Sequence, residues 1–166
     1  MKKLSLRLLV AGAAVVAMLG VPGLVAAGET IHARLNGFEE VPAVSTTGGG
    51  EFRGKISKDG SSFDYELSYA DLEGNSTLFA HIHLGQKDVN GGVSVFLCGG
   101  GGKPACPAIS GTVTGTVLAS DVIGPAGQGI APGEFDELLR AIRAGVTYAN
   151  VHTDKHPGGE IRGQVK

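Results

Sequence analysis

Hydrophobic and polar residues alternate along much of this chain. In segment 51–57, Phe52 and Ile56 fall on one face and charged residues fall on the other. Segment 62–69 repeats the pattern, with four apolar residues on the inward face: Phe63, Tyr65, Leu67 and Tyr69. A period of two residues is typical of a half-buried β-strand. The sequence Lys58-Asp59-Gly60 between the two segments indicates a turn, so together they predict an antiparallel hairpin.

Six further segments have the character of strands. They are 31–36, 77–84, 93–97, 111–118, 146–152 and 160–165. Clusters of Gly, Asn and Pro separate them, and short strands at this spacing favour an all-β, antiparallel sandwich or barrel.

One segment, 132–145, departs from the alternation. Four apolar residues have helical spacing within it: Phe135, Leu138, Leu139 and Ile142. Acidic residues open the segment, Arg140 and Arg143 lie near its end, and Gly145 closes it, as the helix dipole and a C-cap favour. We expect one short surface helix whose apolar stripe contacts the core.

The N-terminus has the pattern of a secretory signal peptide. Basic residues are followed by an apolar stretch over 8–21 and by the small residues Val25-Ala26-Ala27. The alternative is an uncleaved membrane anchor, but the apolar run is short and Pro22-Gly23 interrupts it. We expect cleavage after Ala27 and a mature single domain, residues 28–166, exported to the periplasm or the extracellular space without an integral membrane segment.

Composition limits the partners of this domain. Three of the 14 Lys and Arg residues lie before residue 28, so 11 remain against 16 acidic residues, a net charge of about −5. With this charge, no Trp and no basic cluster, a nucleic-acid partner is not expected. The sequence contains no Ser-His-Asp order, phosphate loop or paired-carboxylate motif, so no catalytic residue is assigned and an enzyme is not favoured. The oligomeric state is not predicted.

Two cysteines, Cys98 and Cys106, flank a glycine-rich loop. In an exported protein, an even pair this close in sequence indicates a disulfide bond. The alternative is a pair of thiolate metal ligands, but the spacing is not the two to four residues of zinc sites.

Four of the five histidines form two close pairs. His81 and His83 are two residues apart on an expected strand, so both imidazoles point to one face. His152 ends a second strand and His156 follows it. These four residues are the candidate ligands of a copper or zinc ion, since imidazole binds both.

Residues beside the histidines could contact the ligands of such a site and orient them. They are Asn150, Asp154, Glu160 and Arg162. Asp154 or Glu160 would orient an imidazole, and Arg162 could form a buried ion pair with Asp154 or Asp71. The competing interpretation is structural: His81 and His83 would be partly buried and hydrogen-bonded to Asn150, Thr153 or Asp154.

The motifs resemble a known family. Segments 80–85, 143–145, 148–153 and 157–164, which read AHIHLG, RAG, YANVHT and PGGEIRGQ, resemble the CHRD domain, named for chordin. The resemblance covers roughly residues 31–165 and implies an immunoglobulin-like sandwich in an exported protein. It implies no settled activity, although chordin itself is a secreted binding protein.

A fainter likeness is to the copper half of copper–zinc superoxide dismutase, a Greek-key sandwich. It would place His81, His83 and His152 where three copper-ligating histidines stand. The histidine and aspartate run that holds zinc in that family is absent between Gly85 and Gly111, and Arg162 stands two places later than that family's guiding arginine.

Three functions follow from these observations. The first is an exported protein that binds a transition metal, copper preferred, without turnover. The second is an envelope module that binds a protein or polysaccharide partner. The third is an oxidoreductase of the superoxide-dismutase type, which needs copper with an open coordination position and a positive charge nearby.

Overall fold

The computed structural model describes residues 28–166. The expected signal peptide, residues 1–27, lies outside the described residues. Eight strands form one antiparallel sheet: β1 (Thr30–Asn36), β2 (Gly49–Ile56), β3 (Ser62–Ala70), β4 (Thr77–Leu84), β5 (Gly92–Cys98), β6 (Gly111–Leu118), β7 (Thr147–Thr153) and β8 (Ile161–Gln164). The expected strands agree with these bounds to within two residues, because turn-forming residues separate the apolar or alternating segments.

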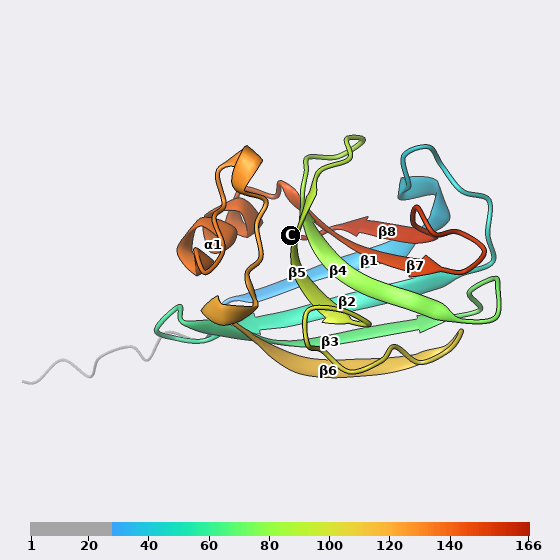
Figure 1. Ribbon diagram of the computed structural model, residues 1–166, viewed down its shortest axis with the longest axis horizontal. Coiled ribbons are helices and arrows are strands. Elements are labelled where there is room, and N and C mark those ends of the chain that lie inside the picture. Colours follow the sequence, from blue (N-terminus) through green and yellow to red (C-terminus); the bar gives the residue numbers. More distant parts are fainter. Residues whose placement is uncertain (1–27) are drawn as a thin grey trace, which may run out of the picture.

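The order of the strands across the sheet is β5-β4-β7-β8-β1-β2-β3-β6. The sheet curls until its two edge strands, β5 and β6, contact each other (Figure 1). The hydroxyl of Tyr65 on β3 reaches across the interior and donates to the carbonyl of Leu97 on β5, at 2.7 Å. The expected all-β, sandwich-like fold is therefore confirmed, in a nearly barrel-like form.

The core fills the inside of this curled sheet. On β1 and β3 every second residue is buried and its neighbours are more exposed, as the alternation predicts. The expected helix is α1 (Phe135–Arg143), and its four apolar residues are all buried. Phe135 lies over Phe63, with ring centroids 6.0 Å apart, so the apolar stripe contacts the core as expected. Three short 3₁₀ helices complete the elements: η1 (Gly37–Glu39), η2 (Ala119–Asp121) and η3 (Ala126–Gln128).

The cysteines form the expected disulfide. Cys98 at the end of β5 is bonded to Cys106, with a Cα–Cα distance of 5.1 Å. The lobe between them leans on the opposite edge of the sheet, because the Lys103 ammonium donates to the carbonyl of Thr116 on β6 at 2.8 Å and pairs with Asp121. The lobe therefore spans the two edge strands. Within residues 28–166, no helix has the length and apolar character needed to cross a membrane.

One strand, β7, is buried on both faces. Its inward face packs on the core, and its outward face lies under two loops, residues 37–48 and 85–91. Arg162 on β8 holds the second loop by donating to the carbonyls of Gln86 and Val89, and Asn90 joins the loops by donating to the carbonyl of Val41. Polar side chains on the outward face of β4, β7 and β8 are therefore removed from water.

Candidate metal site

Three histidines meet on this covered face. His81 and His83 alternate with core residues on β4, and β4 pairs directly with β7, which carries His152. In the register, Phe79 lies opposite His152 and His81 lies opposite Asn150, so His152 is diagonal to His81. One ring nitrogen from each of the three histidines lies within 4.8 Å of the other two. Two segments about 70 residues apart in sequence thus supply one cluster of imidazoles.

Backbone carbonyls orient two of the rings. His83 Nδ1 lies 2.9 Å from the carbonyl oxygen of Gly91, and His152 Nδ1 lies 3.0 Å from that of Pro157. A carbonyl only accepts, so each Nδ1 carries the proton and donates it. This assignment leaves the Nε2 atom of both rings with a free lone pair. A carbonyl partner on one nitrogen commonly fixes the ring of a histidine that binds metal through the other.

The remaining nitrogens in the cluster have no hydrogen-bond partner. His81 Nδ1, His83 Nε2 and His152 Nε2 are all buried and unpaired. Buried polar atoms in proteins are usually paired, and leaving one unpaired costs about 1–3 kcal/mol. Each of the three rings therefore has a buried nitrogen that could bind a further species.

Burial also keeps these rings uncharged. It lowers the pKa of His81 to about 2, with help from the neighbouring His83 and His152. Burial is likewise the main cause that lowers the pKa of His83 to about 4, and it lowers the pKa of His152. Neutral imidazole is the form that binds a metal, so the cluster is in that form at neutral pH.

The spacing of the nitrogens suits one ion after a small contraction. Nitrogens 4.8 Å apart at the corners of a triangle lie about 2.8 Å from its centre, whereas a metal–imidazole bond is about 2.0–2.1 Å long. Each nitrogen must therefore move inward by less than about 1 Å, which small side-chain rotations supply. Three protein ligands with room for a further one is an arrangement found in zinc and copper proteins.

The fourth expected ligand, His156, does not join this cluster. The turn after β7 carries it away, and its Nε2 lies 3.9 Å from the carboxylate of Glu73. Lys155 pairs with the same carboxylate. The structure therefore brings together His81, His83 and His152 and places His156 in a separate group with Glu73 and Lys155.

The four residues expected to support the histidines have other partners. Asn150 donates to Glu40 at 2.6 Å and to the carbonyl of Ile161 at 3.0 Å. Asp154 accepts from the amides of Asn75 and Ser76. In the described chain, the orienting role that we expected of these residues is taken by the two backbone carbonyls.

The other two supporting residues are buried in networks of their own. Glu160 accepts from Thr46, Thr153 and the amide of Glu73. Arg162 donates to Asn90 and two loop carbonyls, and its guanidinium lies 3.4 Å from the centre of the Tyr148 ring. Among residues 28–166 it has no carboxylate within ion-pair distance, so the expected ion pair with Asp154 or Asp71 is corrected to a cation–π contact.

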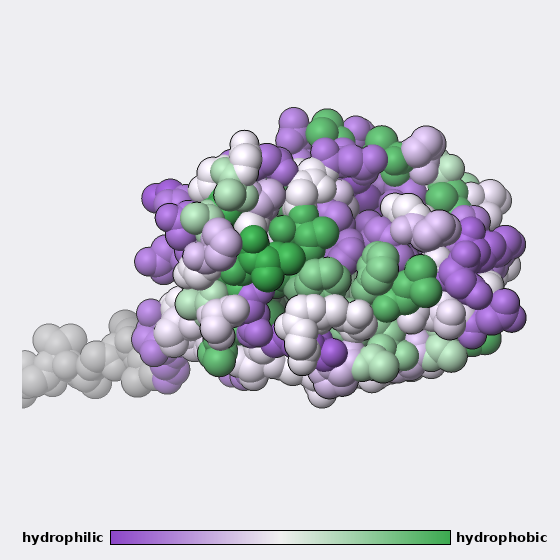
Figure 2. Space-filling view, viewed as in Figure 1, coloured by the Kyte–Doolittle hydropathy of each residue, from purple (hydrophilic) through white to green (hydrophobic). Residues whose placement is uncertain are grey.

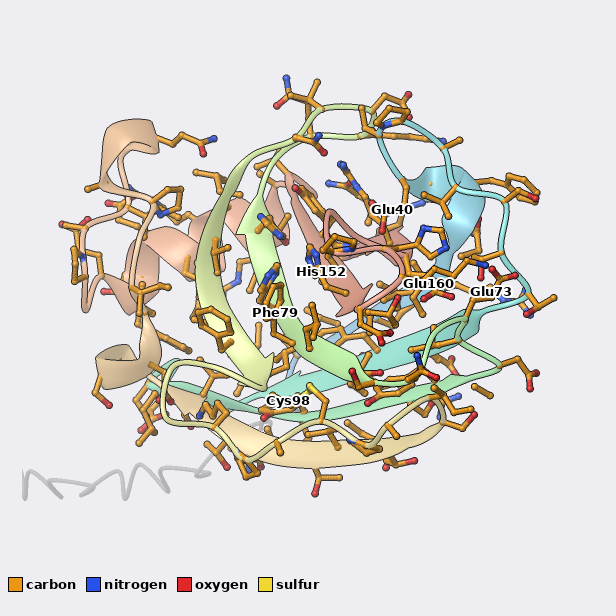
Figure 3. The ribbon with its side chains drawn as sticks, turned by 45° about the vertical axis from the view of Figure 1, so that its right-hand side comes forward. Glu40, Glu73, Phe79, Cys98, His152 and Glu160 are labelled. Carbon is orange, nitrogen blue, oxygen red and sulfur yellow. A yellow bond between two sulfur atoms is a disulfide. The ribbon has the colours of Figure 1, made fainter. Side chains whose placement is uncertain are left out.

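Aromatic rings surround the cluster, and the sequence analysis did not include them. Phe79 lies 4.8 Å from His152 and 5.4 Å from His81 between ring centroids, and Figure 3 shows Phe79 beside His152. Phe96 meets His81 edge to face at 5.3 Å, and Tyr148 stacks on His83 at 4.5 Å. Phe79 had a detectable signal, because it precedes His81 by two residues and shares its face. The carbonyls of Gly91 and Pro157 had none, since every residue has one.

Comparison with known proteins identifies the family of this chain. No curated protein and no solved structure matches the chain significantly. Residues 31–165 match the model of the CHRD domain. Since the match covers nearly all the described residues, including both histidine motifs, the chain belongs to the CHRD domain family.

Proposed function

We propose that this protein is an exported domain that binds one transition-metal ion, copper preferred, through His81, His83 and His152. The role is binding or storage of the metal without turnover. The observation that carries the proposal is the cluster of three buried imidazoles, each of which keeps one nitrogen without a hydrogen-bond partner.

The alternative of purely structural histidines has little support in the hydrogen bonds. The side chains of Asn150, Thr153 and Asp154, which would have been the partners, bond to Glu40, Glu160 and the 75–76 backbone. A structural histidine would gain stability by using both of its nitrogens. Here each ring keeps one buried nitrogen without a hydrogen-bond partner.

The donor atoms favour copper or zinc over harder metals. Imidazole suits copper, zinc, nickel and iron, whereas magnesium and calcium need oxygen ligands. Zinc sites usually have four ligands, and the nearby cysteines are not available as thiolates because they form the disulfide. A disulfide is also stable mainly in oxidising compartments, which supports export together with the leader pattern of residues 1–27.

Metal titration of the mature protein tests this proposal. We expect one copper ion per chain, and His81→Ala, His83→Ala and His152→Ala should each weaken copper binding by about 100-fold or more. His32→Ala and His156→Ala are matched controls that remove a histidine outside the cluster and should bind copper as the wild type does. Equal, weak binding by the wild type and the three cluster variants would show that the cluster is not a metal site.

Two further assays of the same protein test the other two candidate functions. An oxidoreductase of the superoxide-dismutase type requires the copper-loaded protein to dismutate superoxide faster than copper bound to a histidine peptide. An envelope interaction module requires capture of a protein or polysaccharide partner that the three cluster variants still bind. Dismutation at that rate would replace the proposal of binding without turnover. Capture of a partner, with no change of affinity for copper in the cluster variants, would replace the metal-binding proposal itself.

A further inference from the structure

We infer that the three-histidine site is selective for monovalent copper, Cu(I), over Cu(II) and Zn(II), because its surroundings restrict both the number of ligands and the charge it accepts. The inference rests on the proposed function, since it specifies the ion held by the same three histidines.

Aromatic side chains occupy the space around the cluster. His81, His83 and His152 are only 3, 8 and 6% exposed, and the rings of Phe79, Phe96 and Tyr148 lie against them. Phe79 and Phe96, both half-buried, form an aromatic cover over His81 and His152 and contact each other edge to face at 6.4 Å. Hydrophobic side chains come to the surface over β4 and β5 on this side of the molecule (Figure 2). The immediate surroundings of the imidazoles therefore supply hydrocarbon where additional polar ligands would be needed.

The disulfide lobe holds part of this cover in place. Gly100 and Gly101 pass so close to Phe96 that a Cβ at Gly100 would lie 2.5 Å from the ring, and one at Gly101 would lie 3.0 Å from it. Only glycine allows the backbone this approach. The glycines at positions 100 and 101 are thus explained by their contact with the ring that covers His81.

The cluster offers no negative charge to a bound ion. The three ligands are neutral, so a bound ion keeps its full charge in a buried setting. The carboxylates of Glu40 and Glu160 are hydrogen-bonded to Asn150, Thr46 and Thr153, and among residues 28–166 no carboxylate joins the cluster. The positively charged guanidinium of Arg162 lies on the Tyr148 ring that stacks on His83, and it repels a cation.

The aromatic surroundings and the neutral ligands both favour Cu(I). The Born cost of burying an ion rises with the square of its charge, so a divalent ion costs roughly four times as much as a monovalent one. Zn(II) usually takes four ligands in a tetrahedron, and Cu(II) prefers a tetragonal set of nitrogen and oxygen ligands. Cu(I), a d¹⁰ ion, is stable with three nitrogen ligands, which is the number that the cluster provides.

Competition experiments on the metal-free mature protein test this selectivity. Cu(I) affinity is measured without oxygen against a chromogenic Cu(I) chelator, and Cu(II) and Zn(II) affinities are measured by calorimetry. We expect a dissociation constant for Cu(I) at least about 100-fold below those for the two divalent ions. X-ray absorption should find three nitrogen ligands around Cu(I).

Matched variants test whether the aromatic cover causes the preference for Cu(I). Phe79→Asp places a carboxylate beside His81 and His152, whereas Leu78→Asp adds the same charge at an exposed neighbouring position. We expect Phe79→Asp to reduce the preference for Cu(I) by at least about tenfold and Leu78→Asp to leave it unchanged. Phe96→Ala, which opens the cover without adding charge, should reduce the preference as well and serves if Phe79→Asp fails to fold.

The outcomes separate this inference from the proposed function. If the wild type binds Zn(II) or Cu(II) as tightly as Cu(I), the site is a metal site but the selectivity is wrong. If selectivity is present but unchanged in both Phe79→Asp and Phe96→Ala, the aromatic cover is not its cause. Failure of the wild type to bind any of the three ions would overturn the proposed function itself.

Discussion

The imidazole of His83 stacks on the phenol ring of Tyr148, with ring centroids 4.5 Å apart and planes 9° from parallel. The two residues are cross-strand neighbours on β4 and β7. The guanidinium of Arg162, on the next strand β8, lies 3.4 Å from the centre of the same phenol ring. Tyr148 thus joins the candidate metal site to the buried arginine that holds the 85–91 loop.

Replacing this ring tests its contribution to stability. Tyr148→Ala removes both aromatic contacts and leaves a cavity, and we expect the free energy of unfolding to fall by about 3–5 kcal/mol. Tyr148→Phe keeps the ring and loses only the hydrogen bond from the amide of Gly91 to the hydroxyl, so we expect a loss of about 1 kcal/mol and unchanged metal binding. Urea unfolding measures both. A loss in Tyr148→Phe as large as that in Tyr148→Ala would show that the hydroxyl, and not the ring, is the important group.

Much of the fold was predictable because it depends on local patterns. Alternation with a period of two located β2 and β3, and strand-like segments between clusters of Gly, Asn and Pro located the other six strands. Helical spacing located α1, and the short separation of Cys98 and Cys106 predicted their bond. The same period of two placed His81 and His83 on one face. These features need only residues that are close in sequence.

The details of the site depend on pairing between distant segments. Sequence proximity suggested that His156 would join His152, but the turn at 154–159 directs His156 toward Glu73. Arg162 was expected beside an aspartate, whereas the covering loop 85–91 supplies backbone carbonyls instead. No alternation pattern shows which loop covers a sheet face, or which carbonyl meets an imidazole.

Acid should destabilise the metal-free protein through the buried histidines. Each is neutral when folded and takes a proton with an ordinary pKa near 6.5 when unfolded. Its contribution is therefore fully present above pH 6.5 and is lost as the pH falls toward the lowered pKa of the folded state, which is about 4 for His83 and about 2 for His81. Each histidine should lower the free energy of unfolding by about 1.4 kcal/mol per pH unit over that window.

Glu40 should change the free energy of unfolding with pH in the opposite direction. Burial raises its pKa from 4.5 to about 7, so its contribution is present below pH 4.5 and is lost as the pH rises through 7. Urea unfolding between pH 4 and 8 should therefore show a steeper loss of stability on acidification in Glu40→Gln and a shallower one in His81→Gln. His32→Gln, at an exposed position, is the control and should match the wild type. A metal-free protein equally stable at pH 7 and pH 4 would contradict this account.

The turn between β7 and β8 contains a matched pair of glycines. Gly159 has φ of +126°, and a Cβ there would lie 2.7 Å from a Glu40 carboxylate oxygen and 2.9 Å from the Asn150 amide nitrogen. Gly158 has open space around it. We expect Gly159→Ala to cost about 2–4 kcal/mol in free energy of unfolding, and Gly158→Ala to change it by less than about 0.5 kcal/mol. Thermal unfolding of the two variants compares them, and equal melting temperatures would show that Gly159 is not constrained.

The disulfide should stabilise the domain without taking part in metal uptake. Cys98 and Cys106 are eight residues apart, and closing so short a loop contributes about 2–3 kcal/mol, mainly by restricting the unfolded chain. Replacing both cysteines with serine should therefore lower the melting temperature by several degrees. The wild type in a strong reductant should melt at the same temperature as the double variant, since both lack the same bond. Copper should still bind, because the histidines lie on β4 and β7, which pair with each other, and β7 also pairs with β8. Two free thiols in the purified protein, found by mass spectrometry, would refute the bond. Loss of all copper binding in the double variant would show that the lobe holds the ligands as well as Phe96.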